Sequence, residues 1–410
     1  MNRLPLPVLV VGGGVAGMRA ALYLADAGHK VVLAEKDSFL GGQVMRLDKV
    51  YPTDHCAFCP VWPLAAACRS HPGITTRLST QVLALKKKEA STVAVLRTTC
   101  SPVSAVDCVF CGLCLDVCPR KAISGRRDDI PYDPASPPLV VIRSEACDGC
   151  GECAARCPTR AIDLSVLKDG KTVEERLRVQ GVIFATGFEE PVPGPAPEFG
   201  AHSHPDILTA MAFEKTVAEF RAEGALRCPS DKRLAKSIAF VQCAGARDRR
   251  YLAYCSAVCC MHAAKQARWL KRRDPALDVA VFYTDLRAPG KGQERYMRAA
   301  ASEGVRLIRR RPGLVSPLDQ RQRKGILIRH EEKDKVLSTV VDIVVLNGGL
   351  ACSPGLERES AQAPLSSSCG FCREPADIAR SVIQAGDAVN AFLAGPSRPE
   401  KEEATEAPHA

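Results

Sequence analysis

Short apolar runs alternate with turns and helix-like stretches along most of the chain. Residues 4–11 (LPLPVLVV) lead into a glycine-rich turn, then a stretch with helical periodicity, then a second apolar run, KVVLAEK. This order predicts a strand, a helix and a second strand. It returns after residue 230, where KSIAFVQ precedes a turn and the helix-like AVCCMHAAKQAR. We therefore predict an α/β chain with two dinucleotide-type folds.

The first turn carries the glycine pattern of a dinucleotide site at Gly12, Gly14 and Gly17. The first glycine permits the tight turn, the second lets a diphosphate approach the backbone, and the third lets the helix pack on the strand. The helix N-terminus then offers free N–H groups to the phosphates. Glu35 ends the next strand, at the spacing where an acid bonds ribose hydroxyls.

A later segment favours FAD as the dinucleotide. The run GVIFATGFE, residues 181–189, predicts a strand that ends at Ala185, Thr186 and Gly187. A strand that ends in Ala-Thr-Gly resembles the second FAD segment of thioredoxin-reductase-like flavoproteins. An ordinary buried strand with a glycine stop is the alternative for this segment taken alone.

Eight of the 20 cysteines form two runs with the spacing C-x2-C-x2-C-x3-C-P. This spacing is that of bacterial ferredoxins, which bind [4Fe–4S] clusters. Zinc sites and disulfides are weaker alternatives, because zinc ribbons lack the third cysteine and the following proline. In two-cluster ferredoxins the fourth cysteine ligates the other cluster. We therefore expect one set of Cys108, Cys111, Cys114 and Cys157, and another of Cys147, Cys150, Cys153 and Cys118.

The second dinucleotide-type turn is unusual, because it has one glycine where the nucleotide fingerprint has several. A turn with bulky side chains keeps its backbone away from a pyrophosphate, so we expect no nicotinamide site. Four cysteines near this turn instead suggest a third cluster or a thiol pair, with buried structural cysteines as the alternative. These four, called the cysteine quartet below, are Cys243, Cys255, Cys259 and Cys260.

Composition and charge limit the other classes of function. The net charge is +10, but no aromatic residues interleave the basic runs, so we expect no nucleic-acid partner. The N-terminus does not resemble a signal peptide, and no apolar stretch is long enough for a transmembrane helix. Cysteines with metal-ligand spacing fit a reducing compartment. We expect a cytoplasmic protein without direct membrane insertion, at the membrane only through partner subunits.

Several stretches together resemble the A subunits of heterodisulfide reductase and its relatives, including the A subunit of the quinone-interacting membrane-bound oxidoreductase. Among them are GGGVAGMRAALYLADAG, KVVLAEKDSFLGGQV, LDKVYPTDHC, IAFVQCAGARD, YCSAVCCMHAAKQA and FYTDLRAPGKGQERYM. The resemblance implies FAD, two [4Fe–4S] clusters in the ferredoxin-type insert and a third at the quartet. It adds Lys36 and Gly42 as cofactor contacts. It implies partner subunits of a heterodisulfide-reductase-like or quinone-linked complex.

Two further cysteine pairs have the C-x2-C spacing: Cys56 with Cys59, and Cys369 with Cys372. Each could be a redox dithiol, because a thiolate at a helix start is acidified, as dithiol exchange requires. The pairs could also ligate metal, alone or with Cys68. Exposed thiols without such a role are the alternative.

The resulting fold is a thioredoxin-reductase-like flavoprotein with two dinucleotide-type folds and an inserted two-cluster ferredoxin domain. We expect the first segment of the FAD-binding domain at 1–100, the ferredoxin domain at 101–165, a return strand and crossover at 166–200, the second Rossmann-like domain at 201–345, the last FAD-domain segment at 346–395 and a disordered tail at 396–410. The strand at 178–186, the strand in DIVVLNGGL and the helix in ADIARSVIQAGDAVNAFLA should complete the FAD domain.

The function expected from these features is electron transfer by an FAD- and [4Fe–4S]-containing subunit in anaerobic sulfur or disulfide metabolism. No acid–base or nucleophile set is apparent. One alternative is a stand-alone NAD(P)H-dependent disulfide or polysulfide oxidoreductase. The other is a non-catalytic scaffold with structural clusters.

Overall fold

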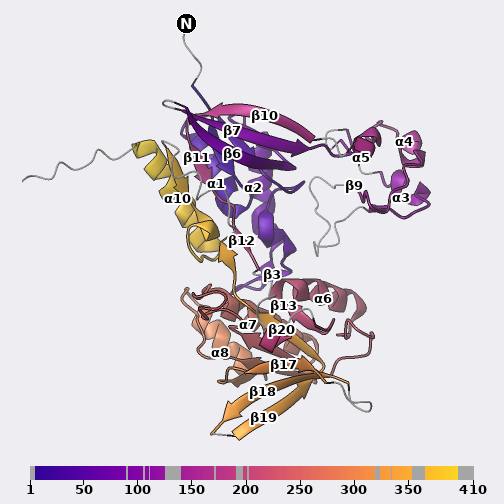
Figure 1. The fold of residues 1–410 in the computed structure, drawn as a ribbon, viewed down its shortest axis with the longest axis vertical. Helices are drawn as coiled ribbons and strands as arrows, with labels where there is room; N and C mark the ends of the chain where they lie inside the picture. The colour runs from indigo at the N-terminus through magenta and orange to yellow at the C-terminus, as the bar shows by residue number, and fades with distance from the viewer. Residues whose placement is uncertain are drawn as a thin grey trace, which may run out of the picture.

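Two lobes of one plan lie one above the other, and a small insert projects from the upper lobe (Figure 1). The computed structural model describes residues 5–88, 91–104, 107–109, 111–124, 140–169, 172–190, 197–200, 203–318, 324–333, 335–352 and 365–395. The expected tail at 396–410 lies outside these residues. Within them, no helix has both the length and the apolar character that crossing a membrane requires.

The first lobe is built on a five-stranded parallel sheet in the order β22-β11-β1-β2-β5. Its central strands are apolar along their whole length and fully buried, as strands covered on both faces must be. The strands are β1 (Val8–Val11), β2 (Val31–Ala34), β5 (Ile74–Arg77), β11 (Val182–Phe184) and β22 (Ser366–Ser368).

Helices cover one face of this sheet and an antiparallel sheet covers the other. Met18, Leu33 and Phe392 belong to the core on the helical side, whereas Leu9, Leu96 and Phe184 belong to the core under the antiparallel sheet. The helices are α1 (Val15–Asp26), α2 (Phe58–Ser70) and α10 (Ile378–Ala394). The antiparallel strands are β6 (Thr80–Lys88), β7 (Ser91–Thr99) and β10 (Thr172–Val179).

The second lobe repeats this plan with the sheet order β13-β20-β14-β15-β16. Its strands are β13 (Ile207–Thr209), β14 (Ser237–Gln242), β15 (Asp278–Phe282), β16 (Arg306–Ile308) and β20 (Ile343–Asn347). The helices are α6 (Ala210–Glu223), α7 (Cys259–Arg273) and α8 (Gln293–Ser302). The antiparallel strands are β17 (Leu314–Pro317), β18 (Ile326–Glu332) and β19 (Lys335–Val341).

Two strand predictions were wrong in detail. The strand in DIVVLNGGL is β20, which pairs with β13 and β14 in the second lobe and not in the FAD domain. The last strand of the first sheet is the short serine strand β22, which pairs with β11. The strand predicted over 178–186 is divided between β10 and β11. The break is at Gly181, where a Cβ atom would come within 2.5 Å of the Leu365 carbonyl oxygen.

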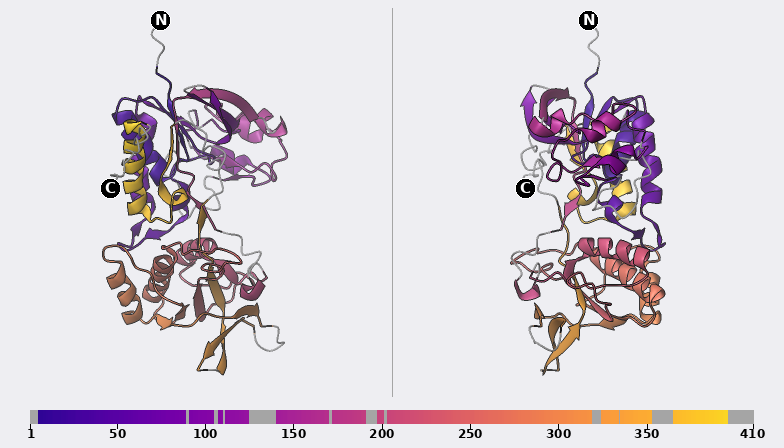
Figure 2. Two further views of the ribbon diagram at one scale, coloured as in Figure 1. Left: turned by 60° about the vertical axis from the view of Figure 1, so that its left-hand side comes forward. Right: turned by 90° about the vertical axis from the view of Figure 1, so that its right-hand side faces the viewer.

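The chain crosses between the lobes twice, and the paired strands β12 (Phe188–Glu189) and β21 (Ala351–Cys352) mark the crossing (Figure 2).

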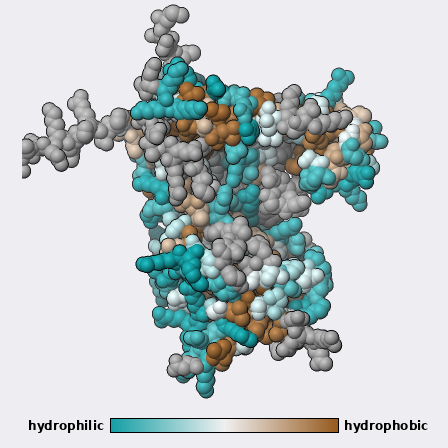
Figure 3. All heavy atoms as spheres, viewed as in Figure 1, coloured by the Kyte–Doolittle hydropathy of each residue, from teal (hydrophilic) through white to brown (hydrophobic). Residues whose placement is uncertain are grey.

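The insert holds α3 (Leu113–Val117), α4 (Glu152–Arg156), α5 (Ser165–Asp169) and the strands β8 (Ile123–Ser124) and β9 (Val141–Ile142). The outer edge of the insert is largely hydrophilic (Figure 3). The remaining short elements are η1 (Gly42–Arg46), η2 (Pro197–Phe199), η3 (Gly370–Cys372), β3 (Lys49–Val50) and β4 (His55–Cys56).

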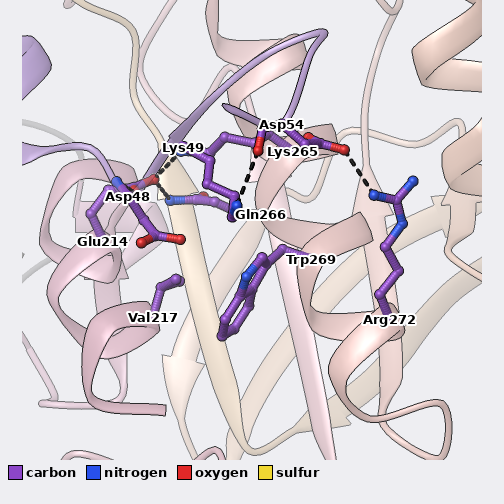
Figure 4. Close-up of a pocket in the computed structure, with 9 residues that line it drawn as sticks. All are labelled: Asp48, Lys49, Asp54, Glu214, Val217, Lys265, Gln266, Trp269 and Arg272. Atoms are coloured by element: carbon purple, nitrogen blue, oxygen red, sulfur yellow. Dashed lines mark hydrogen bonds and ion pairs between the residues drawn. The ribbon is translucent and has the colours of Figure 1, made fainter. Parts of the chain in front are cut away.

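A buried carboxylate joins the two lobes. Glu214, on α6, is 1% exposed and accepts a hydrogen bond from the Asp48 backbone N–H at 2.8 Å. The ammonium of Lys265 lies 2.6 Å from its Oε1 (Figure 4). The ring of His262, also on α7, lies 2.6 Å from the same oxygen. Burial acts to raise the pKa of Glu214, but Lys265 and His262 outweigh it and hold the pKa well below its usual range. The carboxylate is therefore charged.

Ion pairs surround this contact. Arg221 pairs with Asp48 at 2.7 Å. Arg272 pairs with Asp54 at 2.8 Å (Figure 4). Asp48, Asp54 and Arg272 line a cavity of about 100 Å³ to which both lobes contribute. Buried charges with partners on both lobes oppose separation of the lobes, because separation would leave them uncompensated.

Candidate functional site

A cleft of about 580 Å³ opens at the carboxyl ends of β1 and β11 in the first lobe. This edge of a parallel sheet is where nucleotides bind in α/β folds. All predicted cofactor contacts except Gly17 line it: Gly12, Gly14, Glu35, Lys36, Gly42, Ala185, Thr186 and Gly187. The cleft is called the flavin cleft below.

The three motif glycines have different surroundings. A Cβ atom on Gly17 would come within 1.8 Å of the Gly12 carbonyl oxygen, and one on Gly12 within 2.3 Å of the Ala185 oxygen. These two glycines are required by the packing of α1 and β11 on the turn. A Cβ atom on Gly14 would have only one heavy atom near it, at 4.0 Å. The space beside Gly14 belongs to the cleft, so this glycine leaves room for a ligand.

Glu35 lies at the cleft wall, 5% exposed, and also holds the turn together. Its Oε2 accepts from the Gly13 N–H at 2.5 Å, and its Oε1 accepts from the Asp37 N–H at 2.8 Å. Burial raises the pKa of Glu35, against the effect of these two hydrogen bonds. Both carboxylate oxygens retain lone pairs for a further donor such as a ribose hydroxyl.

The hydroxyl of Thr186 gives independent evidence on whether the flavin cleft fits a flavin nucleotide. It is buried at the cleft and has no hydrogen-bond partner among the described residues. Buried hydroxyls are nearly always paired. A bound dinucleotide would supply the missing partner, so the residues present fit FAD.

Further cleft residues come from segments without a recognisable motif. Arg46 follows the glycine pair and donates to Gln43 Oε1 at 2.8 Å. Asp377, Ile378 and Ser381 bring the N-terminus of α10 to the cleft. From the sequence, only the helix predicted in ADIARS could have indicated Asp377, Ile378 and Ser381. Its position at the cleft depends on strand β22.

The insert places its cysteines with approximate internal symmetry. Gly112 and Gly151, both in the left-handed conformation, precede α3 and α4. A small pocket in the insert is lined by apolar side chains and by Cys108, Cys111, Cys114 and Cys157. These are the members of the first set expected from the ferredoxin pairing. The grouping supports that pairing, with the fourth thiol supplied by the other run.

The thiols of the insert also have the hydrogen bonds that cluster ligands use. The Ala122 N–H donates to Cys118 Sγ, and the Ala161 N–H donates to Cys157 Sγ, each at 3.3 Å. No group of three or more His, Cys, Asp or Glu side chains in the described ranges is placed to hold a metal ion. The two N–H···S bonds fit thiolates that ligate a cluster.

The cysteine quartet lies at the carboxyl edge of the second sheet. Cys243 directly follows β14 with a φ of 56°, and Cys259 and Cys260 begin α7. Burial raises the pKa of the Cys259 thiol far above its usual range, and the other three thiols raise it further. Burial raises the pKa of Cys260 to about 11, with Cys243 and Cys255 contributing. The four thiols are thus near enough to influence one another's ionisation.

The same geometry opposes a pyridine nucleotide site there. In the dinucleotide fingerprint, the helix starts immediately after the glycine turn and presents free N–H groups to the pyrophosphate. Here α7 begins only at Cys259, well beyond the end of β14 at Gln242. Its first turn presents thiols, and the intervening loop occupies the sheet edge.

The two remaining C-x2-C pairs differ from each other. Cys59 is exposed, and the thiol of Cys56 raises its pKa. Cys68 is buried and donates to the Met18 carbonyl at 3.4 Å, apart from them. Cys369 and Cys372 are both buried, and the Cys372 thiol donates to the Cys369 carbonyl at 3.2 Å. The second pair is thus shielded from solvent, unlike the exposed Cys59.

Family models match two parts of the chain. Residues 7–55 match the FAD dependent oxidoreductase model, and residues 107–161 match the 4Fe-4S dicluster domain model. The expectations of FAD and of an inserted 4Fe-4S dicluster-type domain are confirmed by these matches, which leave open how many clusters the chain holds.

Relatives of heterodisulfide-reductase type match most of the chain. A protein of Archaeoglobus profundus, named for its likeness to the heterodisulfide reductase A subunit, is 31% identical over 94% of this chain and 65% of its own length. The iron-sulfur A subunit of the CoB–CoM heterodisulfide reductase of Methanocaldococcus jannaschii is 32% identical over 84% of this chain and 54% of its own length. The chain thus spans between about half and two thirds of the length of these relatives.

Solved structures with the same fold are thioredoxin reductases. The enzyme of T. acidophilum aligns with a TM-score of 0.54 at 12% identity, covering 96% of this chain and 99% of that one. The enzyme of Lactococcus lactis gives 0.52 at 14% identity, with 95% and 99% covered. The predicted fold class is confirmed by these alignments.

Proposed function

Because the chain belongs to the A-subunit family of heterodisulfide-reductase-like iron–sulfur flavoproteins, we propose that it is an electron-transferring oxidoreductase subunit. FAD exchanges two electrons, and iron–sulfur clusters exchange one at a time. The residues of the chain hold these groups at fixed positions and adjust their surroundings. The flavin cleft would hold FAD, and the two cysteine runs of the insert would hold two [4Fe–4S] clusters.

One observation carries the proposal beyond a generic flavoprotein. The second lobe has the dinucleotide fold, yet the start of α7 carries Cys259 and Cys260 where a nucleotide site would offer backbone N–H groups. A third cluster at the quartet would replace the pyridine nucleotide as the electron partner in this lobe. This favours electron exchange through proteins over a stand-alone NAD(P)H-dependent enzyme.

The partners and the setting follow from the relatives. Their names refer to subunits of a reductase, so the proposed partners are other subunits of a heterodisulfide-reductase-like or quinone-linked complex. The proposed setting is anaerobic sulfur or disulfide metabolism in the cytoplasm, with any membrane contact made by the partners.

Anaerobic analysis of iron, acid-labile sulfide and flavin in the purified chain tests this function. About twelve irons with one FAD are expected, at four irons for each of three clusters. About eight irons with one FAD would leave the quartet free, and bleaching of the flavin by NADH without a partner would then favour the thiol–disulfide enzyme. Protein without flavin and iron would contradict the proposal.

A variant pair assigns the third cluster. Cys259→Ala should lower the iron content by about four atoms per chain if the quartet holds a cluster. Cys228, also in the second lobe, is fully buried and lies outside the quartet, so Cys228→Ala is the matched control. Equal iron contents in the two variants would contradict a cluster at the quartet.

A further inference from the structure

Two buried amide side chains at the carboxyl edge of the second sheet have no hydrogen-bond partner. Gln242 ends β14 and is 1% exposed, and Asn347 ends β20 and is 2% exposed. The two residues face each other in the parallel ladder. Neither the oxygen nor the nitrogen of either amide is paired with any described residue.

Unpaired amides are unfavourable at this position. A buried polar group without a partner costs about 1–3 kcal/mol, and buried polar groups are nearly always hydrogen-bonded. The residues two positions earlier on each strand, Phe240 and Val345, are apolar and belong to the core. Aliphatic residues at these two positions would extend that core without leaving a polar group unpaired. The amides therefore indicate a bound group that supplies hydrogen-bond partners at the strand ends.

The direction of the side chains identifies the neighbouring site. Side chains alternate along a strand, so Gln242 lies on the same face as Phe240, and Asn347 lies on the same face as Val345. That face is covered by α7, whose Ala263 packs in the same core. The first turn of α7 holds two members of the cysteine quartet, and a third member directly follows Gln242. The unpaired amides therefore lie beneath the quartet.

We propose that the side-chain amides of Gln242 and Asn347 donate hydrogen bonds to the sulfur atoms of the cluster held by the quartet. This inference rests on the proposed function, because it requires that cluster. Hydrogen bonds to the sulfurs are among the factors that set the potential of an iron–sulfur cluster. N–H donors stabilise the reduced form more, because reduction adds negative charge to the sulfurs. The two residues are positioning residues that raise the reduction potential.

The experiment is a redox titration of the purified full chain, followed by electron paramagnetic resonance. Gln242→Met and Asn347→Leu keep the side-chain size and remove the amide. Each should make reduction of the quartet cluster less favourable by about tenfold, a fall of about 59 mV for a one-electron couple. The clusters of the insert should keep their potentials and act as internal references.

Gln384, on α10 in the first lobe, supplies the matched control. It is also a buried glutamine, 4% exposed, with an unpaired Oε1. Gln384→Met should leave the potential of the quartet cluster unchanged, while both test variants keep the iron content of the unmodified chain.

Two results would overturn the inference. One is an unchanged potential of the quartet cluster in both variants at full iron content, as expected if a buried water pairs the amides. The other is an unmodified chain with FAD and about eight irons, four for each cluster of the insert. That second result would leave the electron-transfer function supported, whereas loss of flavin and of all iron would remove the function itself.

Discussion

The carboxylate of Glu214 in the second lobe accepts a hydrogen bond from the backbone N–H of Asp48 in the first lobe, 2.8 Å away. The same carboxylate compensates the buried ammonium of Lys265. One charged group thus stabilises the second lobe and its contact with the first. This contact helps to fix the flavin cleft relative to the cysteine quartet.

Glu214→Gln should destabilise the chain strongly. The substitution keeps a hydrogen-bond acceptor but leaves Lys265 buried without a counter-charge, which costs about 3–5 kcal/mol. Urea denaturation of the FAD-loaded protein measures the change. Glu223→Gln on the same helix is the control, because Glu223 pairs with Arg227 at the surface and its loss costs at most about 1 kcal/mol. Equal changes in the two variants would contradict a role for the buried carboxylate.

The contribution of Glu214 should also depend on pH. Its pKa in the folded chain lies below the ordinary value of 4.5, so the stabilisation is complete above about pH 4.5. It is lost as the pH falls further, through the folded pKa. The stability difference between the unmodified chain and Glu214→Gln should persist at pH 5 and shrink below about pH 4.5. Between pH 8 and pH 5 the difference should grow if anything, because Glu214 also acts to raise the pKa of His262. A difference that grows further below about pH 4.5 would contradict this assignment.

Gly14→Ala should impair FAD binding, whereas Gly17→Ala should impair folding of the turn. Gly17→Ala places a methyl group against the Gly12 carbonyl, so it should prevent normal folding of the turn. Gly14→Ala has space for its methyl group in the protein itself, and should fold but bind FAD at least about tenfold more weakly, or about 1.4 kcal/mol. Flavin titration of the apoprotein and its circular dichroism separate the two effects. Unchanged FAD affinity in Gly14→Ala would show that the diphosphate does not lie beside Gly14.

Thr186→Val tests the unpaired hydroxyl in the flavin cleft. The substitution keeps the shape and removes a hydroxyl that no described residue pairs, so FAD affinity should fall by about tenfold, or about 1.4 kcal/mol. Thr92, on β7, also has a buried hydroxyl without a partner but does not line the cleft. Thr92→Val should leave FAD affinity unchanged. Equal affinity in the two variants would place the flavin away from Thr186.

Paired substitutions in the insert test which run supplies the fourth ligand. If the runs exchange their fourth cysteines, Cys108→Ala with Cys157→Ala removes one cluster, about four irons. Cys108→Ala with Cys118→Ala then removes both, about eight irons. If each run binds its own cluster, the two results are reversed. Iron analysis of the two double variants therefore distinguishes the pairings.

Local sequence was sufficient for the parts of the molecule whose contacts are close in the chain. The glycine turn at Gly12 and Gly14 lies directly between strand β1 and helix α1, so the motif describes a complete local structure. The same holds for the cysteine spacing within each run of the insert. In both cases the chemistry requires particular residues at short, fixed separations.

Strand pairing was less predictable. The apolar strand β20 and the serine strand β22 were difficult to assign, because an apolar run shows that a strand is buried but not which sheet it joins. Gln242 and Asn347 are separated by about a hundred residues, and only their pairing reveals two neighbouring unpaired amides.

The sequence by itself determined the cofactor classes and the α/β fold, since these depend on short motifs and on periodicity. Only the tertiary structure decided which strands share a sheet, how Glu214 joins the lobes and which polar atoms remain unpaired. These properties depend on contacts between distant segments. Such contacts form through burial and electrostatic interactions, which the residues of one segment do not specify.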